Sequence, residues 1–255
     1  MISLRDSIPN AMHATAVAHP NIALVKYWGK SDVTQNLPAV GSLSITVAGL
    51  ATTTTVRFDP DLGADRFRLG GREEPTMARR VSACLDELRR RVGSSLHAEV
   101  ESGNDFPTAA GLASSASGFA ALVVAADAAI GAGLPRRELA ELARRASGSA
   151  PRSLFGGFVE LALVDSGQGT ETRQLLEPAV WPLAVAVAVT ASGPKAVGST
   201  EGMLASERSS PYYAAWVASS PADLEAARAA VAARDFEGLA AVSEASCLAM
   251  HGVML

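Results

Sequence analysis

The sequence predicts an α+β fold in which sheets and helices form packed layers. Strand patterns and helical patterns are mixed in the first part of the chain, and everything after Ser199 has a helical pattern. Strands first and helices last favour an α+β architecture over a regular βαβ series. The 255 residues, 48% of them hydrophobic, are enough for one large domain or two small ones, and no repeat, low-complexity linker or change of composition divides them.

The early strands are predicted from alternating and β-branched residues. Residues 42–48 and 52–58 have these patterns and Gly49 lies between them, so we expect a hairpin. Residues 66–69 predict a short strand that ends at two glycines. Residues 96–100 alternate as a half-buried strand does, and they lead into a Ser-rich loop.

Three helices are predicted in the middle of the chain. Pro75 begins the first and Gly93 ends it. An Ala-rich apolar segment at 119–130 forms the second, and Pro135 begins a third that ends near Ala146. The apolar residues of the first helix share one face, as in a helix that packs against a core. They are Met77, Val81, Cys84, Leu85, Leu88 and Val92.

Two later strands and a helical C-terminal part complete the expected fold. Residues 158–164 and 183–189 have strand patterns. Residues 222–233 and 236–250 have helical patterns, and Asp235 is the expected N-cap of the last helix.

Charge and cysteine content exclude several classes of protein. A net charge of −4, without a dense basic face, argues against a nucleic-acid binder. The arginine clusters at 89–91 and 144–145 lie on helical segments, where we expect solvated faces. Cys84 and Cys247 lie in apolar helical patterns without a partner at metal or redox spacing, which predicts buried free thiols in a reducing compartment.

The sequence predicts neither export nor membrane insertion. Arg5, Asp6 and Pro9 occupy the region where a signal peptide requires an apolar run. The longest clean apolar run, 183–189, is far too short to span a bilayer. We therefore expect a soluble cytoplasmic protein with no nucleic-acid or membrane partner.

The segment PTAAGLASSASG, residues 107–118, is the most informative part of the chain. Its small side chains permit close approach of backbone to a ligand, and it runs into an apolar helix whose free N–H groups favour an anion. Ser114, Ser115 and Ser117 add hydroxyl donors. The segment predicts phosphate binding; the alternative is a Ser-capped helix after an ordinary loop.

A second segment, HPNIALVKYWGK at 19–30, carries two lysines beside aromatic residues. Lys26 and Lys30 flank Tyr27, Trp28 and Gly29, which suits a cleft for a phosphate or carboxylate. The GKS at 29–31 is not a Walker motif, because Leu24 stands where the first glycine is required. The alternative is a strand that ends in an exposed Lys-rich turn.

Two further segments add polar turns. In SGSAPRSLFGG, residues 147–157, small and hydroxyl residues surround Arg152, which offers a bidentate donor to an anion or, alternatively, caps the preceding helix. KAVGSTEGM, residues 195–203, is a weaker Ser/Thr/Gly turn entering a helix. Together with scattered Lys and Arg, these anion-receptive turns suit phosphoryl transfer, where catalysis is mostly positioning and charge stabilisation.

Other chemistries are not indicated by the residues. The four histidines form no HxH, HExxH or Cys/His pattern, so we expect no transition metal. No G-x-S-x-G nucleophile elbow is present, which argues against Ser-His-Asp catalysis.

Taken together, these motifs resemble a known family. PTAAGLASSASG resembles the phosphate loop of the GHMP kinase superfamily. With NIALVKYWGK, GREE, SGSAPRSLFGGFVE and GSTEGM, the chain from about Thr15 to its last residue is similar to the diphosphomevalonate decarboxylases within it. The resemblance implies a two-layer sandwich with an N-terminal part like ribosomal protein S5 domain 2 at 1–190. It also implies the start of a helical, ferredoxin-like C-terminal part at 191–255.

The family's reaction follows from the resemblance as well. It implies that ATP with Mg²⁺ phosphorylates the C3 hydroxyl of (R)-5-diphosphomevalonate, and that loss of phosphate and CO₂ then gives isopentenyl diphosphate and ADP. The resemblance further implies a homodimer.

The resemblance also assigns site residues. Lys26, near the C3 hydroxyl, and Arg152, near the reacting centre, match catalytic positions. The substrate-binding positions are Tyr27, Trp28, Gly29, Lys30, Arg72, Ser147, Gly148, Ser149, Ala150, Pro151, Arg152, Ser199, Thr200 and Met203. The ATP-binding positions are Ala110, Gly111, Leu112, Ala113, Ser114, Ser115 and Ala116. Pro151 departs from the family, in which cysteine is common, and its fixed φ is expected to stiffen the loop.

A second departure concerns the C-terminal end. The family places an essential aspartate in a DAGPN-like turn beyond the region that MHGVML matches, and no such segment occurs in these 255 residues. We therefore expect a truncated or incompletely represented decarboxylase. The alternatives are a related GHMP small-molecule kinase, a 5-phosphomevalonate decarboxylase, or an inactive form that only binds ligand.

Overall fold

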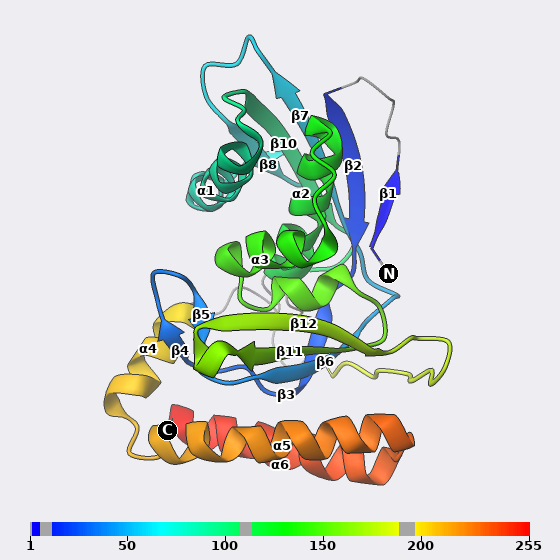
Figure 1. Ribbon diagram of the computed structural model, residues 1–255, viewed down its shortest axis with the longest axis vertical. Coiled ribbons are helices and arrows are strands. Elements are labelled where there is room, and N and C mark those ends of the chain that lie inside the picture. The colour runs from blue at the N-terminus through cyan, green and yellow to red at the C-terminus, as the bar shows by residue number, and fades with distance from the viewer. Residues whose placement is uncertain (1, 6–11, 108–113, 189–196) are drawn as a thin grey trace.

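The β-structure of this chain consists of a six-stranded sheet, a four-stranded sheet and a two-stranded ribbon (Figure 1). The computed structural model describes residues 2–5, 12–107, 114–188 and 197–255. The six-stranded sheet has the order β1-β2-β7-β10-β8-β9, antiparallel except where β10 and β8 pair in parallel. Its strands are Ser3–Arg5, His13–Ala18, Thr52–Asp59, His97–Asn104, Arg66–Leu69 and Arg72–Glu73 in that order. The expected α+β class is confirmed.

The four-stranded sheet is antiparallel in the order β12-β11-β6-β3. Its strands are Gly169–Leu176, Phe158–Val164, Ser42–Thr46 and Asn21–Val25. The ribbon pairs β4, Lys30–Asp32, with β5, Leu37–Pro38. The helices are α1 Pro75–Val92, α2 Ser114–Ile130, α3 Arg136–Ala146, α4 Ser199–Ser209, α5 Tyr213–Ala233 and α6 Phe236–Met254, with short 3₁₀ turns η1 Ala150–Leu154 and η2 Asp165–Gly167.

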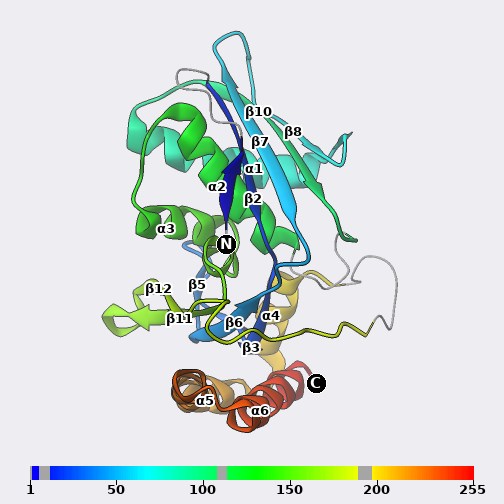
Figure 2. The ribbon, with the colours of Figure 1, turned by 90° about the vertical axis from the view of Figure 1, so that its right-hand side faces the viewer.

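The helices cover the two sheets in separate layers. α1 and α2 lie on one face of the six-stranded sheet, α3 packs against these two helices, and α5 and α6 run side by side under the four-stranded sheet (Figures 1 and 2). The larger core cluster joins α1–α3 to the six-stranded sheet, whereas a second cluster joins Val25, Leu43 and Phe158 of the four-stranded sheet to Leu224 and Leu239 of α5 and α6. Within the described part of the chain, no helix is long and apolar enough to cross a membrane.

Local sequence signals account for the helices. The predicted stripe of α1 is buried or packed against the core, and Gly93 ends the helix in the left-handed region at φ 67°, donating its N–H to Arg89 O. α2 is buried around most of its surface, since Ala-rich faces let it pack closely between the sheet and α3. The strands at 66–69 and 158–164 and the helices beginning near Pro75 and Pro135 are all confirmed.

The predicted hairpin at 42–58 is wrong. β6 pairs with β3 and β11 in one sheet, whereas β7 pairs with β2 and β10 in the other. The residues around Gly49 therefore carry the chain from one sheet to the other. Alternation along a strand predicts which residues face the core, but it carries no information about the strand's partner.

The predicted strand at 183–189 is not present in its described part. Residues 183–188 pair with no strand among the described residues, and Val185 and Val187 are exposed. An apolar alternation favours a strand only where a neighbouring backbone supplies hydrogen bonds. Residue 189 lies outside the described residues.

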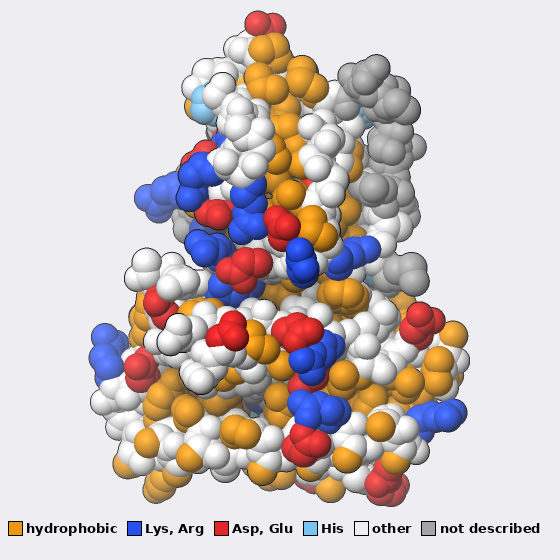
Figure 3. Space-filling model, in the orientation of Figure 1, with side chains coloured by type: hydrophobic (Ala, Val, Ile, Leu, Met, Phe, Trp, Pro, Cys, Tyr) orange, Lys and Arg blue, Asp and Glu red, His pale blue; other side chains and the backbone are white. Residues whose placement is uncertain are grey.

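The expectation of solvated arginine clusters is wrong for one residue in each cluster. Arg89 is buried and paired with Asp65 and Asp86, and Arg144 is 1% exposed, paired with Glu141 and hydrogen-bonded to Gln35 O at 2.7 Å. The neighbouring Arg91 and Arg145 do lie beside acidic side chains. Figure 3 shows that basic and acidic side chains are interleaved on the face in view. Helical periodicity does not reveal that a loop from elsewhere will cover a charged residue.

The cysteine prediction is confirmed for one residue. Both thiols are free, and burial raises the pKa of Cys84 to about 12. Cys247 is only half-buried, with its sulfur 3.7 Å from His251 Nδ1, so the expectation that it is buried is wrong.

The predicted N-cap of the last helix gives a direct stability test. Asp235 accepts a hydrogen bond from the Gly238 N–H at 3.0 Å. Replacing Asp235 by Ala should lower the free energy of unfolding by about 1 kcal/mol, because one N–H at the helix start loses its partner. Urea denaturation checks this, with Asp235→Asn as the control that retains an oxygen acceptor. An unchanged free energy of unfolding in Asp235→Ala would show that the cap contributes nothing.

Candidate functional site

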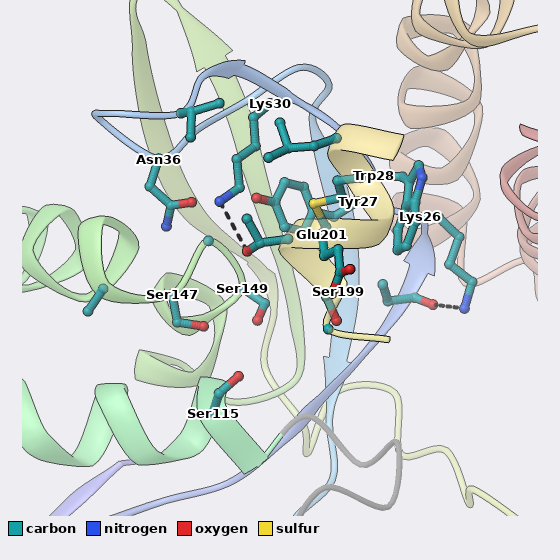
Figure 4. A pocket seen from close by; sticks show the side chains of 18 of the residues that line it. Lys26, Tyr27, Trp28, Lys30, Asn36, Ser115, Ser147, Ser149, Ser199 and Glu201 are labelled. Atoms are coloured by element: carbon teal, nitrogen blue, oxygen red, sulfur yellow. Dashed lines mark hydrogen bonds between the residues drawn. The ribbon is translucent and has the colours of Figure 1, made fainter. Parts of the chain in front are cut away.

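A cavity of about 1030 Å³ collects most of the predicted site residues. It is bordered by the turn after β3, the turn between α3 and η1, the first turns of α2 and α4, and α1 (Figure 4). The predicted residues that line it are Lys26, Tyr27, Trp28, Lys30, Ser115, Ser147, Gly148, Ser149, Arg152, Ser199, Thr200 and Met203. Segments more than a hundred residues apart in the sequence therefore form one site.

The turn after β3 places two amines and two aromatic rings at the cavity. Lys26 Nζ donates to Ala23 O at 2.9 Å, and Lys30 Nζ donates to Thr200 Oγ1 at 3.3 Å. Burial, and then the positive charge of Arg80, lowers the pKa of the Lys30 amine. Burial also raises the pKa of Tyr27 to about 12, so this phenol is neutral over the physiological range.

Arg152 is the most deeply buried cation of the cavity lining, with 1% of its surface exposed. Its guanidinium donates to Ser44 Oγ at 3.1 Å, to Ser42 Oγ, and to Asn21 Oδ1 at 3.4 Å. No carboxylate among the described residues lies within salt-bridge distance of it, and burial lowers its pKa to about 10. A buried cation held only by neutral groups is poised for an anion.

The first turn of α2 reaches the cavity through one predicted residue. Ser115 lines it, whereas Ala116 is fully buried behind. Ser114 belongs to the same turn but not to the lining. The predicted ATP-binding residues Ala110, Gly111, Leu112 and Ala113 lie outside the described residues.

Four predicted substrate-binding residues do not line the cavity. Ala150 and Pro151 are buried within η1, where they support the turn that carries Arg152. Gly29 lies behind the lining, with φ 93° and Tyr213 directly against it. Arg72 is exposed on β9, outside the cavity.

Arg80 is a cavity residue that the sequence patterns did not indicate. It lies on α1, donates to Ala146 O at 2.7 Å, and stacks over the Phe119 ring at 4.9 Å. Its position is three residues after Met77 and four before Cys84, in line with the face that packs inward, but the residue itself is exposed. A cation on the apolar face of a helix was the signal available. Other lining residues not predicted include Asn21, Asn36, Arg145, Glu201 and Arg208.

The cavity is electropositive. Its lining holds six basic residues, Lys26, Lys30, Arg80, Arg145, Arg152 and Arg208, whereas Glu201 is the one acidic residue among the described lining. Within the described chain, no three His, Cys, Asp or Glu residues lie close enough to hold a metal ion. The arrangement suits a ligand with several negative charges, such as phosphates or a carboxylate.

Two family profiles match the chain. The diphosphomevalonate decarboxylase-like N-terminal domain matches residues 18–172, and the mevalonate 5-diphosphate decarboxylase C-terminal domain matches residues 185–255. Among curated relatives, diphosphomevalonate decarboxylase of Homo sapiens is 44% identical over 216 residues, covering 77% of this chain and 53% of the relative. That of Ganoderma lucidum is 37% identical over 261 residues, covering 95% of this chain and 65% of the relative.

Solved structures agree with these relatives. MDDEF in complex with MVAPP, AMPPCP and magnesium is 37% identical, with a TM-score of 0.84, and the match covers 94% of this chain and 74% of that one. Mevalonate diphosphate decarboxylase from Staphylococcus aureus is 36% identical, also with a TM-score of 0.84, covering 99% of this chain and 74% of that one. The chain spans between about half and two thirds of the length of the curated relatives above. By both profiles and these structures, the chain belongs to the diphosphomevalonate decarboxylase family.

Proposed function

We propose that this chain carries the substrate site for ATP-dependent decarboxylation of (R)-5-diphosphomevalonate to isopentenyl diphosphate, with ADP, phosphate and CO₂ as the other products. The observation that supports it most strongly is Arg152, a buried cation without a carboxylate partner in the described chain, in a cavity with five other basic residues. The substrate has a carboxylate at one end and a diphosphate at the other, which matches a cavity with several separate cations.

Each end of the substrate has suitable partners in the cavity. Lys30 and Arg80 are close enough for the charge of Arg80 to help lower the pKa of Lys30, and together they suit the diphosphate. Arg152 suits the carboxylate, and the hydroxyls of Ser147 and Ser149 are additional donors beside it. We assign Lys26, another lining residue, to the C3 hydroxyl and the phosphate that this hydroxyl receives.

The reaction needs positioning and charge stabilisation more than a covalent catalyst. The C3 oxygen attacks the terminal phosphorus of ATP, its proton passes to solvent, and ADP leaves with the electron pair of the broken P–O bond. The C3–O bond then breaks with the electron pair going to phosphate, while the bond between C2 and the carboxylate carbon supplies the electrons of the new double bond and releases CO₂. Lys26 stabilises the charge on the leaving phosphate, and Arg152 holds the carboxylate until it departs.

Magnesium and ATP fit the residues present. Mg²⁺ takes oxygen ligands and is bound largely by nucleotide phosphates and water, with few protein ligands. Ser115, at the N-terminal turn of α2, and Glu201, on α4, are the lining oxygen donors suited to it. When bound, the ion would neutralise charge on the ATP phosphates. The magnesium and AMPPCP in the complex of MDDEF support this part of the proposal.

The deciding experiment measures CO₂ and phosphate released from 5-diphosphomevalonate with Mg-ATP, using purified protein. Mevalonate and 5-phosphomevalonate serve as competing substrates. Equal release of CO₂ and phosphate from the diphosphate supports the proposal. Preference for 5-phosphomevalonate would indicate a 5-phosphomevalonate decarboxylase, and phosphorylation without release of CO₂ would indicate a kinase. Thermal stabilisation by the ligand without turnover would indicate a form that only binds ligand.

The placement of Arg72 and Arg80 gives a second test. We expect Arg80→Ala to weaken binding of 5-diphosphomevalonate at least tenfold, because a lining cation is lost, and Arg72→Ala to leave it unchanged. Calorimetric titration of the two variants measures this. The reverse order would favour Arg72, the residue that the family resemblance indicates, and would place the diphosphate away from Arg80.

The remaining expectations are also proposals. We propose a cytoplasmic homodimer in which residues 1–190 and 191–255 form two structural parts. The two free cysteines support a reducing compartment. Sedimentation equilibrium of the purified protein tests the dimer, and fractionation of the source cell tests the compartment.

A further inference from the structure

The turn that carries the cavity amines packs against three other segments, the turn between α3 and η1, α4 and α5, through aromatic rings and glycines. A Cβ on Gly148 would overlap the Tyr27 phenol, and one on Gly29 would overlap the Tyr213 phenol. A Cβ on Gly202, in α4, would lie 3.2 Å from the Trp28 ring. Each ring therefore covers a glycine of a different segment, and it is the Trp28 ring that covers the glycine of α4; Figure 4 shows Trp28 beside Tyr27 at the cavity.

One polar bond accompanies the contact of Trp28 with α4. The indole Nε1–H of Trp28 donates to Ser206 Oγ at 3.0 Å, and Ser206 is 6% exposed. Along α4, only Met203 and Ser206 are buried, so most of this helix has little packing of its own. A second bond from the turn to α4, Lys30 Nζ to Thr200 Oγ1, is longer, at 3.3 Å, and exposed.

The first turn of α4 supplies Ser199 and Thr200 to the cavity lining. Their hydroxyls keep their places only while α4 is docked on the turn. We propose that Ser206 is a positioning residue: by accepting the Trp28 indole N–H it fixes α4 against the 27–30 turn and so holds Ser199 and Thr200 at the ligand. The identity of the ligand in this assignment rests on the proposed function, whereas the docking of α4 does not.

Ser206→Ala tests the proposal, because it removes the acceptor and strands a half-buried N–H. In the ligand-free protein, we expect faster amide hydrogen exchange at residues 199–209 and unchanged exchange in α5 and α6. Binding of 5-diphosphomevalonate should weaken about tenfold. Ser206→Thr should restore both readouts. Ser209→Ala is the matched control, because Ser209 is exposed on the same helix and its hydroxyl donates to Ala205 O, at 2.8 Å, within that helix.

A double-mutant cycle with Trp28→Phe isolates the bond. This variant retains an aromatic ring but loses the donor, so adding Ser206→Ala to it should change α4 exchange no further. Wild-type exchange at 199–209 in Ser206→Ala overturns the proposal, and so does fully additive behaviour. If Ser206→Ala unfolds as a whole, the exchange patterns of the Ser206→Thr and Trp28→Phe variants decide whether the bond holds α4 in place. Failure of the wild-type chain to bind 5-diphosphomevalonate would refute the proposed function, whereas the exchange measurement still tests the docking.

Discussion

Arg152→Ala should reduce kcat/KM for 5-diphosphomevalonate by about a thousandfold, the largest loss expected of a single substitution in this site. Truncating one member of a buried, charged hydrogen-bonded set costs about 2–5 kcal/mol, and about 4 kcal/mol corresponds to three orders of magnitude in rate. The guanidinium is 1% exposed and its hydrogen-bond partners, Ser42, Ser44 and Asn21, are neutral. In our proposal the anionic substrate supplies the missing negative charge.

Two variants separate the catalytic effect from a loss of structure. Arg152→Lys retains the charge without the planar fork, and we expect an intermediate loss because the simultaneous bonds to Ser42, Ser44 and Asn21 need that fork. Arg208→Ala removes an exposed cation from the same cavity and should lose less than tenfold. Steady-state kinetics and the midpoint of thermal unfolding are measured for each variant. Near-normal kcat/KM in a folded Arg152→Ala protein would refute the role of Arg152.

Gly157→Ala should be the most destabilising glycine substitution in the described chain. Gly157 precedes β11 with φ 71°, and a Cβ there would overlap the carbonyl oxygen of Leu176 and approach Pro178 N at 2.8 Å. Both obstacles are backbone atoms, which cannot rotate away. The left-handed conformation costs a residue with a Cβ about 1–2 kcal/mol, and the backbone displacement adds to it, so we expect a total of about 3 kcal/mol or more.

Gly71→Ala is the matched control for the steric part. Gly71 has φ 76°, but among the described residues beyond its chain neighbours no heavy atom lies within 4 Å of the position that a Cβ would take, so only the conformational strain applies there. We expect Gly71→Ala to lower the free energy of unfolding by about 1 kcal/mol. For Gly157→Ala we expect a fall in Tm of roughly 6–12 °C, because each kcal/mol lost lowers Tm by about 2–4 °C in a chain of this size. Equal destabilisation of the two variants would show that the overlap near Leu176 is relieved without cost.

The site was predictable wherever a short segment carries its own signal. Lys26 to Lys30 and the segment around Arg152 were found because small, hydroxyl and cationic residues together favour an anion, whatever the rest of the chain does. Arg80 was missed because its signal lies in its position on a helix face, and Arg72 was selected only from the family resemblance. The structure places Arg80 in the cavity lining and Arg72 on an exposed strand.

The sequence by itself determined the local elements of this protein. Proline, glycine and Asp235 set helix ends through φ restriction and capping, and the stripe from Met77 to Val92 set the buried face of α1, because these effects act within a few residues. Only the tertiary structure decided that β6 and β7 join different sheets, that Arg144 is covered by Gln35, and that Arg152 meets Ser42 and Ser44. Those outcomes depend on contacts between residues from about twenty to more than a hundred positions apart, and such contacts are selected by packing of the whole chain rather than by any local preference.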